Sequence, residues 1–539
     1  MDPRGAGVDR VLLPSRGGPF AQRMNNRRLT LRNTALASIG IYVEYFLGMV
    51  AAILIARHLG PASYGIYSLF IWFAAIGIVL TNSGITTGVI KFIAEFRGAE
   101  RPELIWPLLR QMRTAQTWHM ALVVIVGSIL LLLARPHWID APGAGEFALL
   151  MFGVVMRGPY MFNVAVAKGF EAFDATARIS VFAAPVNLAL VIAAILLKGT
   201  VLWFLIVYAT SSALFLLASH LQVRRLLAGL PAAASLSLEQ KQRIRRHLRI
   251  VSVTIVVNFF IASDVEILFL NLDATSAAAG FFKVAYQLAT GMVLLVPGVF
   301  GAVLLPMMSK ALSQSRELAG RRFAAVTTYL LLLCAPVAVF GICFAGPVIE
   351  LLYGHAYAEA APVFALIILA CAISTTNQGA VSLLVSADRQ QTVLLMTVIF
   401  GVLKLSLDAS LIHRFGLHGA VAAVLTVSIL SSTAYIGAGI RVGRVSMEWR
   451  RLFAILVASL LTATIALPVL LLHLPTLLTV FLGGLVVALV FAVATLCLPC
   501  WSAADIEQLQ ELHARFARSR PRPLSRLLRH AGNRAEKWS

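Results

Sequence analysis

Long apolar runs separated by short polar connectors fill most of the chain between residues 34 and 498. Most runs are about 20 to 26 residues long, which at 1.5 Å rise per residue covers the roughly 30 Å of bilayer hydrocarbon. The runs are continuous rather than alternating, so they predict membrane-spanning helices and argue against a β-barrel. We place fourteen spans at 34–57, 66–90, 114–134, 146–167, 178–197, 201–222, 249–271, 280–305, 322–345, 360–385, 392–412, 417–440, 452–473 and 476–498.

The first two runs form a helical hairpin, residues 31–96, that the chain repeats. A turn rich in glycine and proline at 59–67 joins them, because irregular backbone must stay outside the hydrocarbon. Residues 272–282 echo this turn faintly, and each segment opens a long apolar helix after a glycine and an aromatic residue. Spans one and two then match spans seven and eight at an offset of about 215 residues, and such repeats place a substrate path between the halves.

The longest polar interruption between spans, residues 222–248, divides the first twelve spans into six and six. We therefore predict an all-α polytopic membrane protein with two six-helix lobes and two extra C-terminal helices. The expected order is a basic cytoplasmic tail at 1–29, an N-lobe at 30–228, a cytoplasmic linker at 229–247, a C-lobe at 248–443, the extra helices at 444–500 and a basic cytoplasmic tail at 501–539. The last tail fits an amphipathic helix on the membrane or a solvated segment.

Composition and charge agree with this pattern. Hydrophobic residues make up 59% of the chain and charged residues 13%, with a mean hydropathy of +0.85, whereas soluble domains carry about 25% charged residues. The net charge of +21 would suit nucleic acid, but Lys and Arg gather in the connectors after even-numbered spans. The connectors after odd-numbered spans hold only Arg57, Arg135, Lys198 and Arg414. By the positive-inside rule both termini are cytoplasmic, and we expect no nucleic-acid partner.

The motifs of several function classes are missing from the sequence. It contains no phosphate-binding loop of the form G-x-x-x-x-G-K-[ST], and no soluble interval could hold a nucleotide-binding domain, so direct ATP drive is excluded. Short external connectors favour a transporter, flippase or channel over an enzyme. Cys497-Leu-Pro-Cys500 is a lone pair of thiols and weak evidence for zinc. We predict no enzymatic activity, no cofactor and no metal site.

Ionisable residues inside the spans are the sharpest functional signal. Each costs at least about 2.5–3.5 kcal/mol unless it has a partner or a water-filled cavity. The candidates are Glu44 in the first span, Arg157 in the fourth, Asp264 and Glu266 in the seventh, Lys283 in the eighth, and Lys404 and Asp408 in the eleventh. Asp264 and Glu266 are two residues apart on the predicted helix, so at most one would line a given cavity.

Three of these positions each have two open interpretations. Arg157 either contacts a ligand or pairs with Glu44, since both lie near mid-membrane. Lys283 either contacts a ligand or extends to the outer interface. Lys404 and Asp408 are four residues apart on one helical face, which allows either a self-contained salt bridge or a coupling site.

Three motifs outside the spans are distinctive. They are Arg57–Tyr67, Leu351–Tyr357 followed by Ala360-Ala361-Pro362, and Lys168–Phe173. The first resembles the R-x-L-G-P-x-x-Y-G-x-Y hairpin of bacterial polysaccharide transporters, the Wzx-type flippases. The resemblance covers about residues 30 to 500 and, together with the predicted spans, is typical of the multidrug/oligosaccharidyl-lipid/polysaccharide exporter superfamily.

This resemblance implies two lobes related by a pseudo-two-fold axis, a central cavity that alternates its opening, and a location in the bacterial inner membrane among membrane lipids. The implied cargo is an undecaprenyl-diphosphate-linked glycan for surface polysaccharides such as exopolysaccharide or O-antigen, with a polysaccharide polymerase and a chain-length regulator as partners. A diphosphate in a low-dielectric cavity needs fixed cations. Arg157 and Lys283 are therefore predicted substrate-binding residues, with Glu44 as a third.

The energy source is expected to be an ion gradient or the membrane potential, since no nucleotide site exists. In the lipid II branch of the superfamily, a sodium ion is held by an acid on the seventh helix and a pair four residues apart on the eleventh. This chain resembles that arrangement at Asp264 and at Lys404 with Asp408. The Lys404 ammonium would then take the place of sodium, and a proton on Asp264 or Asp408 would couple transport.

Two other functions remain open at this stage. An ion-coupled multidrug exporter of amphipathic cations would use Glu44 and Asp264 as binding acids, although the multidrug branch usually has twelve spans. A lipid II flippase would have fourteen spans, but members of that branch carry basic residues on the first helix. Here Glu44 is the only charge inside the first span.

Overall fold

The computed structural model describes residues 19–134, 143–231, 235–262, 264–294, 301–502, 505–507 and 510. Within these ranges every regular element is a helix, which confirms the predicted all-α class. Residues 1–18 and 511–539, which form most of the two predicted basic tails, lie outside the described residues.

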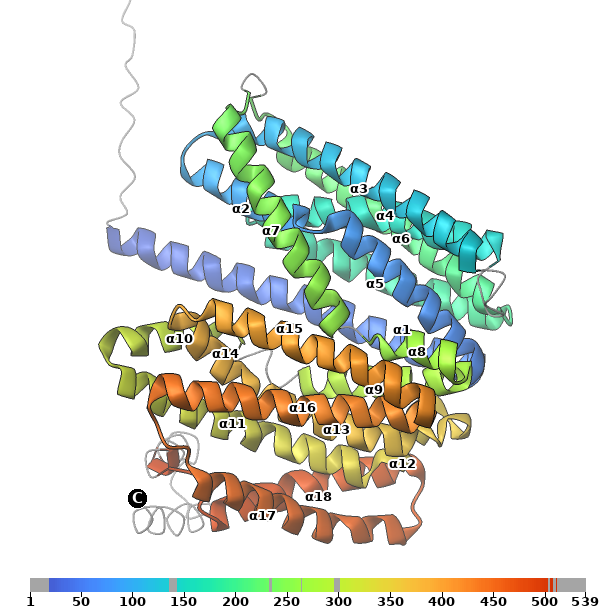
Figure 1. Cartoon of the computed structure of the whole chain (residues 1–539), viewed down its shortest axis with the longest axis vertical. Helices are drawn as coiled ribbons and strands as arrows, with labels where there is room; N and C mark the ends of the chain where they lie inside the picture. The colour runs from blue at the N-terminus through green and yellow to red at the C-terminus, as the bar shows by residue number, and fades with distance from the viewer. Residues whose placement is uncertain are drawn as a thin grey trace, which may run out of the picture.

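The helices up to residue 227 form one group, drawn from blue to green in Figure 1. They are α1 (Pro19–Asn82), α2 (Ile85–Gly98), α3 (Ile105–Ala134), α4 (Ala144–Gly169), α5 (Phe173–Leu196) and α6 (Val201–Leu227). α1 packs on α4 and α5, and α4 packs on α6. α1 is two helices joined at Gly60, whose φ of 74° and ψ of 171° break the helical path where the sequence predicts a turn.

The second group contains the helices from residue 266 to 443. They are α8 (Glu266–Asp273), α9 (Ser276–Leu294), α10 (Gly301–Gln314), α11 (Arg316–Cys343), α12 (Ala345–Tyr353), α13 (Ala360–Thr375), α14 (Asn377–Ser386), α15 (Gln390–Leu407) and α16 (His413–Gly443). α13 contacts α9, α11 and α16. The two extra helices, α17 (Trp449–Ala466) and α18 (Thr476–Cys497), pack on each other and against α11, below the second group in Figure 1.

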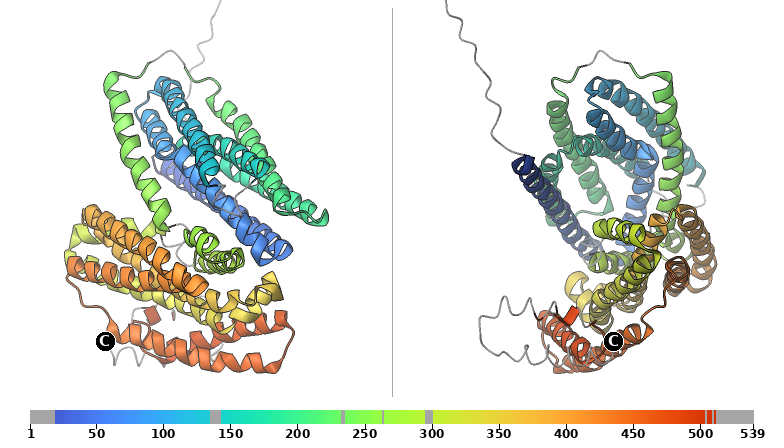
Figure 2. Two further views of the ribbon diagram at one scale, coloured as in Figure 1. Left: turned by 45° about the vertical axis from the view of Figure 1, so that its right-hand side comes forward. Right: turned by 90° about the vertical axis from the view of Figure 1, so that its left-hand side faces the viewer.

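α7 (Leu238–Ala262) crosses between the two groups, as Figures 1 and 2 show. Near its start Ile244 is buried in an apolar cluster with α2 and α3. Arg243 makes two hydrogen bonds to the Glu95 carboxylate of α2, of 2.6 and 3.0 Å. Further along, the Ser252 hydroxyl donates to the Ser83 carbonyl oxygen at 2.8 Å. α7 also contacts α15, so one helix touches both groups.

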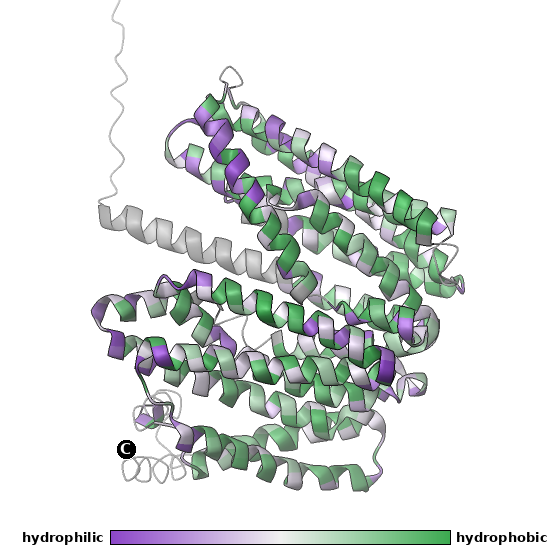
Figure 3. Cartoon of the chain, viewed as in Figure 1, coloured by the Kyte–Doolittle hydropathy of each residue, from purple (hydrophilic) through white to green (hydrophobic). Residues whose placement is uncertain are grey.

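Ten helices in the described ranges are long and apolar enough to cross a bilayer, as expected of a multi-pass membrane protein. Tyr42–Gly98 has 57 residues and Gln390–Gly443 has 54, and each exceeds the roughly 20 residues of a single crossing. The predicted spans 249–271 and 280–305 fall where residues 263 and 295–300 are not described. The count of fourteen therefore stays a prediction. Figure 3 shows hydrophobic residues along the middle of the helices and hydrophilic ones towards their ends.

Helix boundaries differ from the sequence prediction at two places near the N-terminus. α1 begins at Pro19, well before the expected start at residue 34. The predicted span 66–90 is interrupted at Gly84, whose φ of 71° is left-handed. A Cβ atom at Gly84 would lie 2.7 Å from the Ser252 hydroxyl, so glycine also permits the close approach of α7.

The two groups meet most tightly at a pair of glycines. Gly65 and Gly280 hold matching places in the predicted repeat. A Cβ atom on Gly65 would lie 1.7 Å from the Ser276 carbonyl oxygen, and one on Gly280 would lie 2.1 Å from that of Pro61. Any side chain at either position would overlap backbone. The faint echo between the two turns therefore marks the place where α1 and α9 cross.

Two of the distinctive sequence motifs also meet in space. An Arg57 guanidinium nitrogen donates to the Leu351 carbonyl oxygen at 3.4 Å. The Tyr357 hydroxyl donates to the Ala56 carbonyl oxygen at 2.8 Å, and its ring is fully buried. These contacts link the α1 kink to the short helix His355–Tyr357, so both motifs belong to one contact between the groups.

Candidate functional site

The charge in the first predicted span faces the charge in the fourth. An Arg157 guanidinium nitrogen on α4 lies 3.9 Å from a Glu44 carboxylate oxygen on α1. The Ser180 hydroxyl of α5 donates to the other Glu44 oxygen at 2.6 Å. The guanidinium also stacks on Tyr160 and Phe215, with 4.9 and 4.5 Å to the ring centroids. The pair is partly exposed, with 25% of the Arg157 side chain and 39% of the Glu44 side chain accessible.

The charges of the seventh and eighth predicted spans also pair. The Lys283 ammonium of α9 donates to the Asp264 carboxylate, and the Lys283 side chain is 25% exposed. Asp264 lies between the end of α7 at Ala262 and the start of α8 at Glu266. Lys283 is therefore paired with an aspartate, Asp264, that lies in the connection between α7 and α8.

A third cluster joins α8 to α15 around one lysine. The Lys404 ammonium lies 2.9 Å from a Glu266 oxygen and 3.6 Å from an Asp408 oxygen. The Glu266 and Asp408 side chains are fully buried, and Lys404 is 11% exposed. Asp408 starts a π-helical turn, Asp408–Ile412. The distance to Asp408 is longer than a hydrogen bond, so Lys404 is held mainly by Glu266.

The structure brings the six predicted residues together as Arg157 with Glu44, Lys283 with Asp264, and Lys404 with Asp408. The sequence identifies Glu266 as an intramembrane charge but does not predict it as a site residue, because a continuous seventh helix would turn it away from Asp264. The helix is instead interrupted between Ala262 and Glu266. The only available sequence signal was the acidic pair itself, which carries no information about the break.

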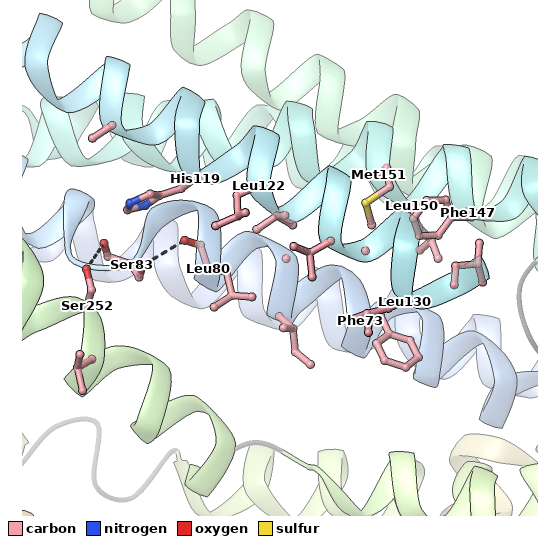
Figure 4. A pocket seen from close by; sticks show the side chains of 18 of the residues that line it. Phe73, Leu80, Ser83, His119, Leu122, Leu130, Phe147, Leu150, Met151 and Ser252 are labelled. Carbon is pink, nitrogen blue, oxygen red and sulfur yellow. Dashed lines mark hydrogen bonds between the residues drawn. The ribbon is translucent and has the colours of Figure 1, made fainter. Parts of the chain in front are cut away.

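Two cavities adjoin α3 and α7. The first, of about 1280 Å³, lies between α1, α3, α4, α7 and α8 and is lined mainly by apolar side chains such as Leu80, Leu122 and Met151 (Figure 4). The second, of about 1320 Å³, lies between α3, α4, α6 and α7. Its cationic lining consists of Arg110, Arg113, Arg224, Lys241 and Arg245.

Comparison with known proteins gives one family and several related folds. The chain matches the family described as polysaccharide biosynthesis protein over residues 54–362, more than half of its length. The lipid II flippase MurJ in an inward closed conformation has a TM-score of 0.65 at 13% identity, covering 86% of this chain and 98% of that one. An inward-facing multidrug resistance MATE family transporter of the MOP superfamily has a TM-score of 0.62 at 14% identity, with coverages of 76% and 99%. A MATE structure in the bent conformation has a TM-score of 0.53 at 15% identity, with coverages of 77% and 95%. No curated protein sequence matches this chain.

The apolar helices and the related folds define a multi-pass membrane protein whose fold is similar to that of MurJ and of a MATE family transporter. The chain belongs to the polysaccharide biosynthesis protein family. This family match confirms the resemblance that the sequence motifs indicated. At identities of 13–15%, the likeness to MurJ and the MATE transporters is evidence for the fold alone.

Proposed function

We propose that this protein flips undecaprenyl-diphosphate-linked oligosaccharide repeat units across the bacterial inner membrane by ion-coupled alternating access, with both termini in the cytoplasm. The observation that carries the proposal is the occurrence, in one chain, of the polysaccharide biosynthesis family match and the fold of a lipid II flippase. A membrane protein of that family that moves a lipid-linked precursor would supply a polymerase and a chain-length regulator on the far side.

Arg157 and Lys283 are the proposed ligands of the diphosphate, and Glu44, predicted as a third substrate-binding residue, is proposed instead as the carboxylate that the diphosphate displaces from Arg157. Each is held by a carboxylate, Glu44 for Arg157 and Asp264 for Lys283. A diphosphate brings about two negative charges and several acceptor oxygens, so it competes with a single carboxylate for either cation. The long 3.9 Å contact and the partial exposure of Arg157 favour this exchange at the Glu44 pair. The cations are thereby kept neutralised until the headgroup arrives.

The Glu266, Lys404 and Asp408 cluster is the proposed coupling site, with Glu266 in place of the predicted Asp264, because Asp264 pairs with Lys283 and Glu266 with Lys404. With all three groups ionised it has one excess negative charge, and both carboxylates are fully buried. An uncompensated buried charge is costly, so the cluster favours the uptake of one proton. Protonation of Asp408 would weaken its attraction to Lys404 and leave the bond to Glu266. The cluster joins α8 to α15, so this change acts where two helices of the second group meet.

The contacts of the acids bear on the alternative of an exporter for amphipathic cations. That function would need Glu44 and Asp264 as binding acids, and each already faces a cation of the protein. A positively charged drug would therefore have to displace Arg157 or Lys283 from its partner. The charge arrangement supports an anionic headgroup as the ligand.

Deletion of the gene in its native host should test the function. We expect surface polysaccharide to disappear and the undecaprenyl-diphosphate-linked repeat unit to accumulate in the inner membrane, while resistance to ethidium stays unchanged. Plasmid expression of the full chain should restore export. Normal surface polysaccharide together with a gain in ethidium sensitivity would instead support the multidrug exporter.

A further inference from the structure

The cationic cavity combines positive charge with aromatic side chains at one end of the helices. Arg110 and Arg113 come from α3, Arg224 from α6, and Lys241 and Arg245 from α7. None of the described residues that line it is acidic. Trp118 and Trp106 also line it and are 72% and 40% exposed. Tryptophan is enriched at the level of lipid headgroups, so this lining suits the membrane interface.

Among the residues that the structure describes, no ion pair uses a cation that lines this cavity. The ion pairs nearby, Arg101 with Glu103 and Arg243 with Glu95, use arginines that do not line it. Arg113 is oriented by a 3.0 Å hydrogen bond to the Asn163 side-chain oxygen, which is neutral. Like charges from three helices repel one another, and a bound anion would offset that repulsion.

The apolar cavity is the direct continuation of the cationic one. Ala115, Arg245 and Leu248 line both, so the two cavities meet between α3 and α7. From there, side chains such as Leu122, Leu130 and Phe147 line the apolar cavity away from the Ser83 and Ser252 hydrogen bond (Figure 4). The two cavities together form a charged chamber followed by a mainly apolar one, whose arginines, Arg245 and Arg249, both lie on α7.

We propose that these cavities form a loading site for a polyprenyl diphosphate, with the diphosphate on the cations and the isoprenoid chain in the apolar cavity. This proposal rests on the proposed function and locates where the lipid carrier first binds. Charge-assisted hydrogen bonds from arginine suit phosphate oxygens. The apolar cavity lies between α3 and α4 of the first group and α7 and α8, so a chain bound there leads towards the contact between the groups.

The shape of the site favours a polyprenyl chain over a membrane phospholipid. The apolar cavity that continues from the cations can take the one chain of a polyprenyl diphosphate, whereas a membrane phospholipid has at least two chains to place. α7 carries Lys241 and Arg245, and Arg245 lines both chambers. A bound lipid would therefore contact α7 with its head and with its chain.

Binding to the purified full chain in detergent should separate the two chambers. The head variant is Arg110→Gln/Arg224→Gln/Lys241→Gln, and the chain variant is Leu122→Trp/Met151→Trp. We expect the head variant to weaken the binding of both undecaprenyl diphosphate and inorganic diphosphate by at least about tenfold. The chain variant should weaken the binding of undecaprenyl diphosphate by at least about tenfold and leave the binding of inorganic diphosphate unchanged.

Matched controls change the same residue types elsewhere. Lys310→Gln/Arg321→Gln/Arg389→Gln removes three cations from the same predicted side of the membrane, and Leu461→Trp/Leu485→Trp adds bulk on α17 and α18. Both should bind like the wild type. Size-exclusion profiles report folding, and Arg224→Gln alone replaces the head variant if the triple change does not fold.

Three results would overturn the loading site. They are unchanged binding in both variants, equal losses in the controls, and displacement of undecaprenyl diphosphate by an equal concentration of cardiolipin. The assay involves no transport, so its failure leaves the proposed function standing. Conversely, normal binding in a protein that flips no lipid-linked glycan would refute the function and keep the site.

Discussion

Replacing Lys404 by methionine should lower the free energy of unfolding by about 3–5 kcal/mol, because it leaves two carboxylates buried without their cation. The Glu266 and Asp408 side chains are both shielded from solvent, with exposures of 0%, and both face Lys404. The measurement is equilibrium unfolding in mixed micelles, followed by tryptophan fluorescence. Methionine keeps most of the side-chain volume, so the loss reports charge rather than packing.

Two further variants make this result specific. Lys404→Met/Glu266→Gln/Asp408→Asn removes all three charges and should recover most of the lost stability. Lys310→Met changes an exposed lysine, and its effect should stay within about 0.5 kcal/mol. Wild-type stability in Lys404→Met would show that the buried cluster does not hold α8 to α15.

Removing the proposed headgroup cations should abolish export of surface polysaccharide. Arg157→Ala and Lys283→Ala each take away a fixed positive charge that a diphosphate needs in a low-dielectric site. Export is measured in the deletion strain at equal protein level. We expect it to fall to the level of the empty plasmid for the double variant, and wild-type output from both single variants would exclude a role for these cations.

The partners of these cations separate ligand binding from simple structural pairing. Glu44→Gln and Asp264→Asn leave Arg157 and Lys283 in place but remove the competing carboxylates. If the cations bind the diphosphate, these two variants should retain export that Arg157→Ala and Lys283→Ala lose. An equal loss of export when either the cation or the carboxylate of a pair is replaced would instead indicate that the ion pairs only stabilise the fold.

Much of the architecture could be predicted because bilayer thickness imposes a length on apolar runs. The turn at Gly60 and the two extra helices follow from the spacing of polar connectors, whereas the six-and-six division of the spans stays a prediction. Breaks inside apolar runs could not be predicted in this way. Gly84 and the interruption before Glu266 depend on which backbone approaches them, and Asp408–Ile412 forms a π-helical turn within an otherwise helical pattern.

The candidate site was only partly predictable for a related reason. An ionisable residue inside an apolar span can be recognised because burying its charge in the membrane is costly. Arg157, Lys283 and Lys404 could therefore be predicted as candidate site residues from the sequence. Their partners depend on how helices pack, and the periodicity of one helix does not supply that. Glu266 pairs with Lys404 because α8 begins as a separate helix after the break. The lining of the two cavities likewise combines side chains from helices that are far apart in the sequence.

The most direct test uses proteoliposomes that contain a labelled undecaprenyl-diphosphate-linked oligosaccharide and an impermeant reagent that modifies only exposed glycan. An imposed pH gradient should increase the modified fraction above that of empty liposomes, while a sodium gradient should have no effect. A modified fraction equal to that of empty liposomes under every gradient would contradict the account. Flipping driven by sodium and indifferent to pH would contradict the proton coupling proposed for Lys404 and its two acids.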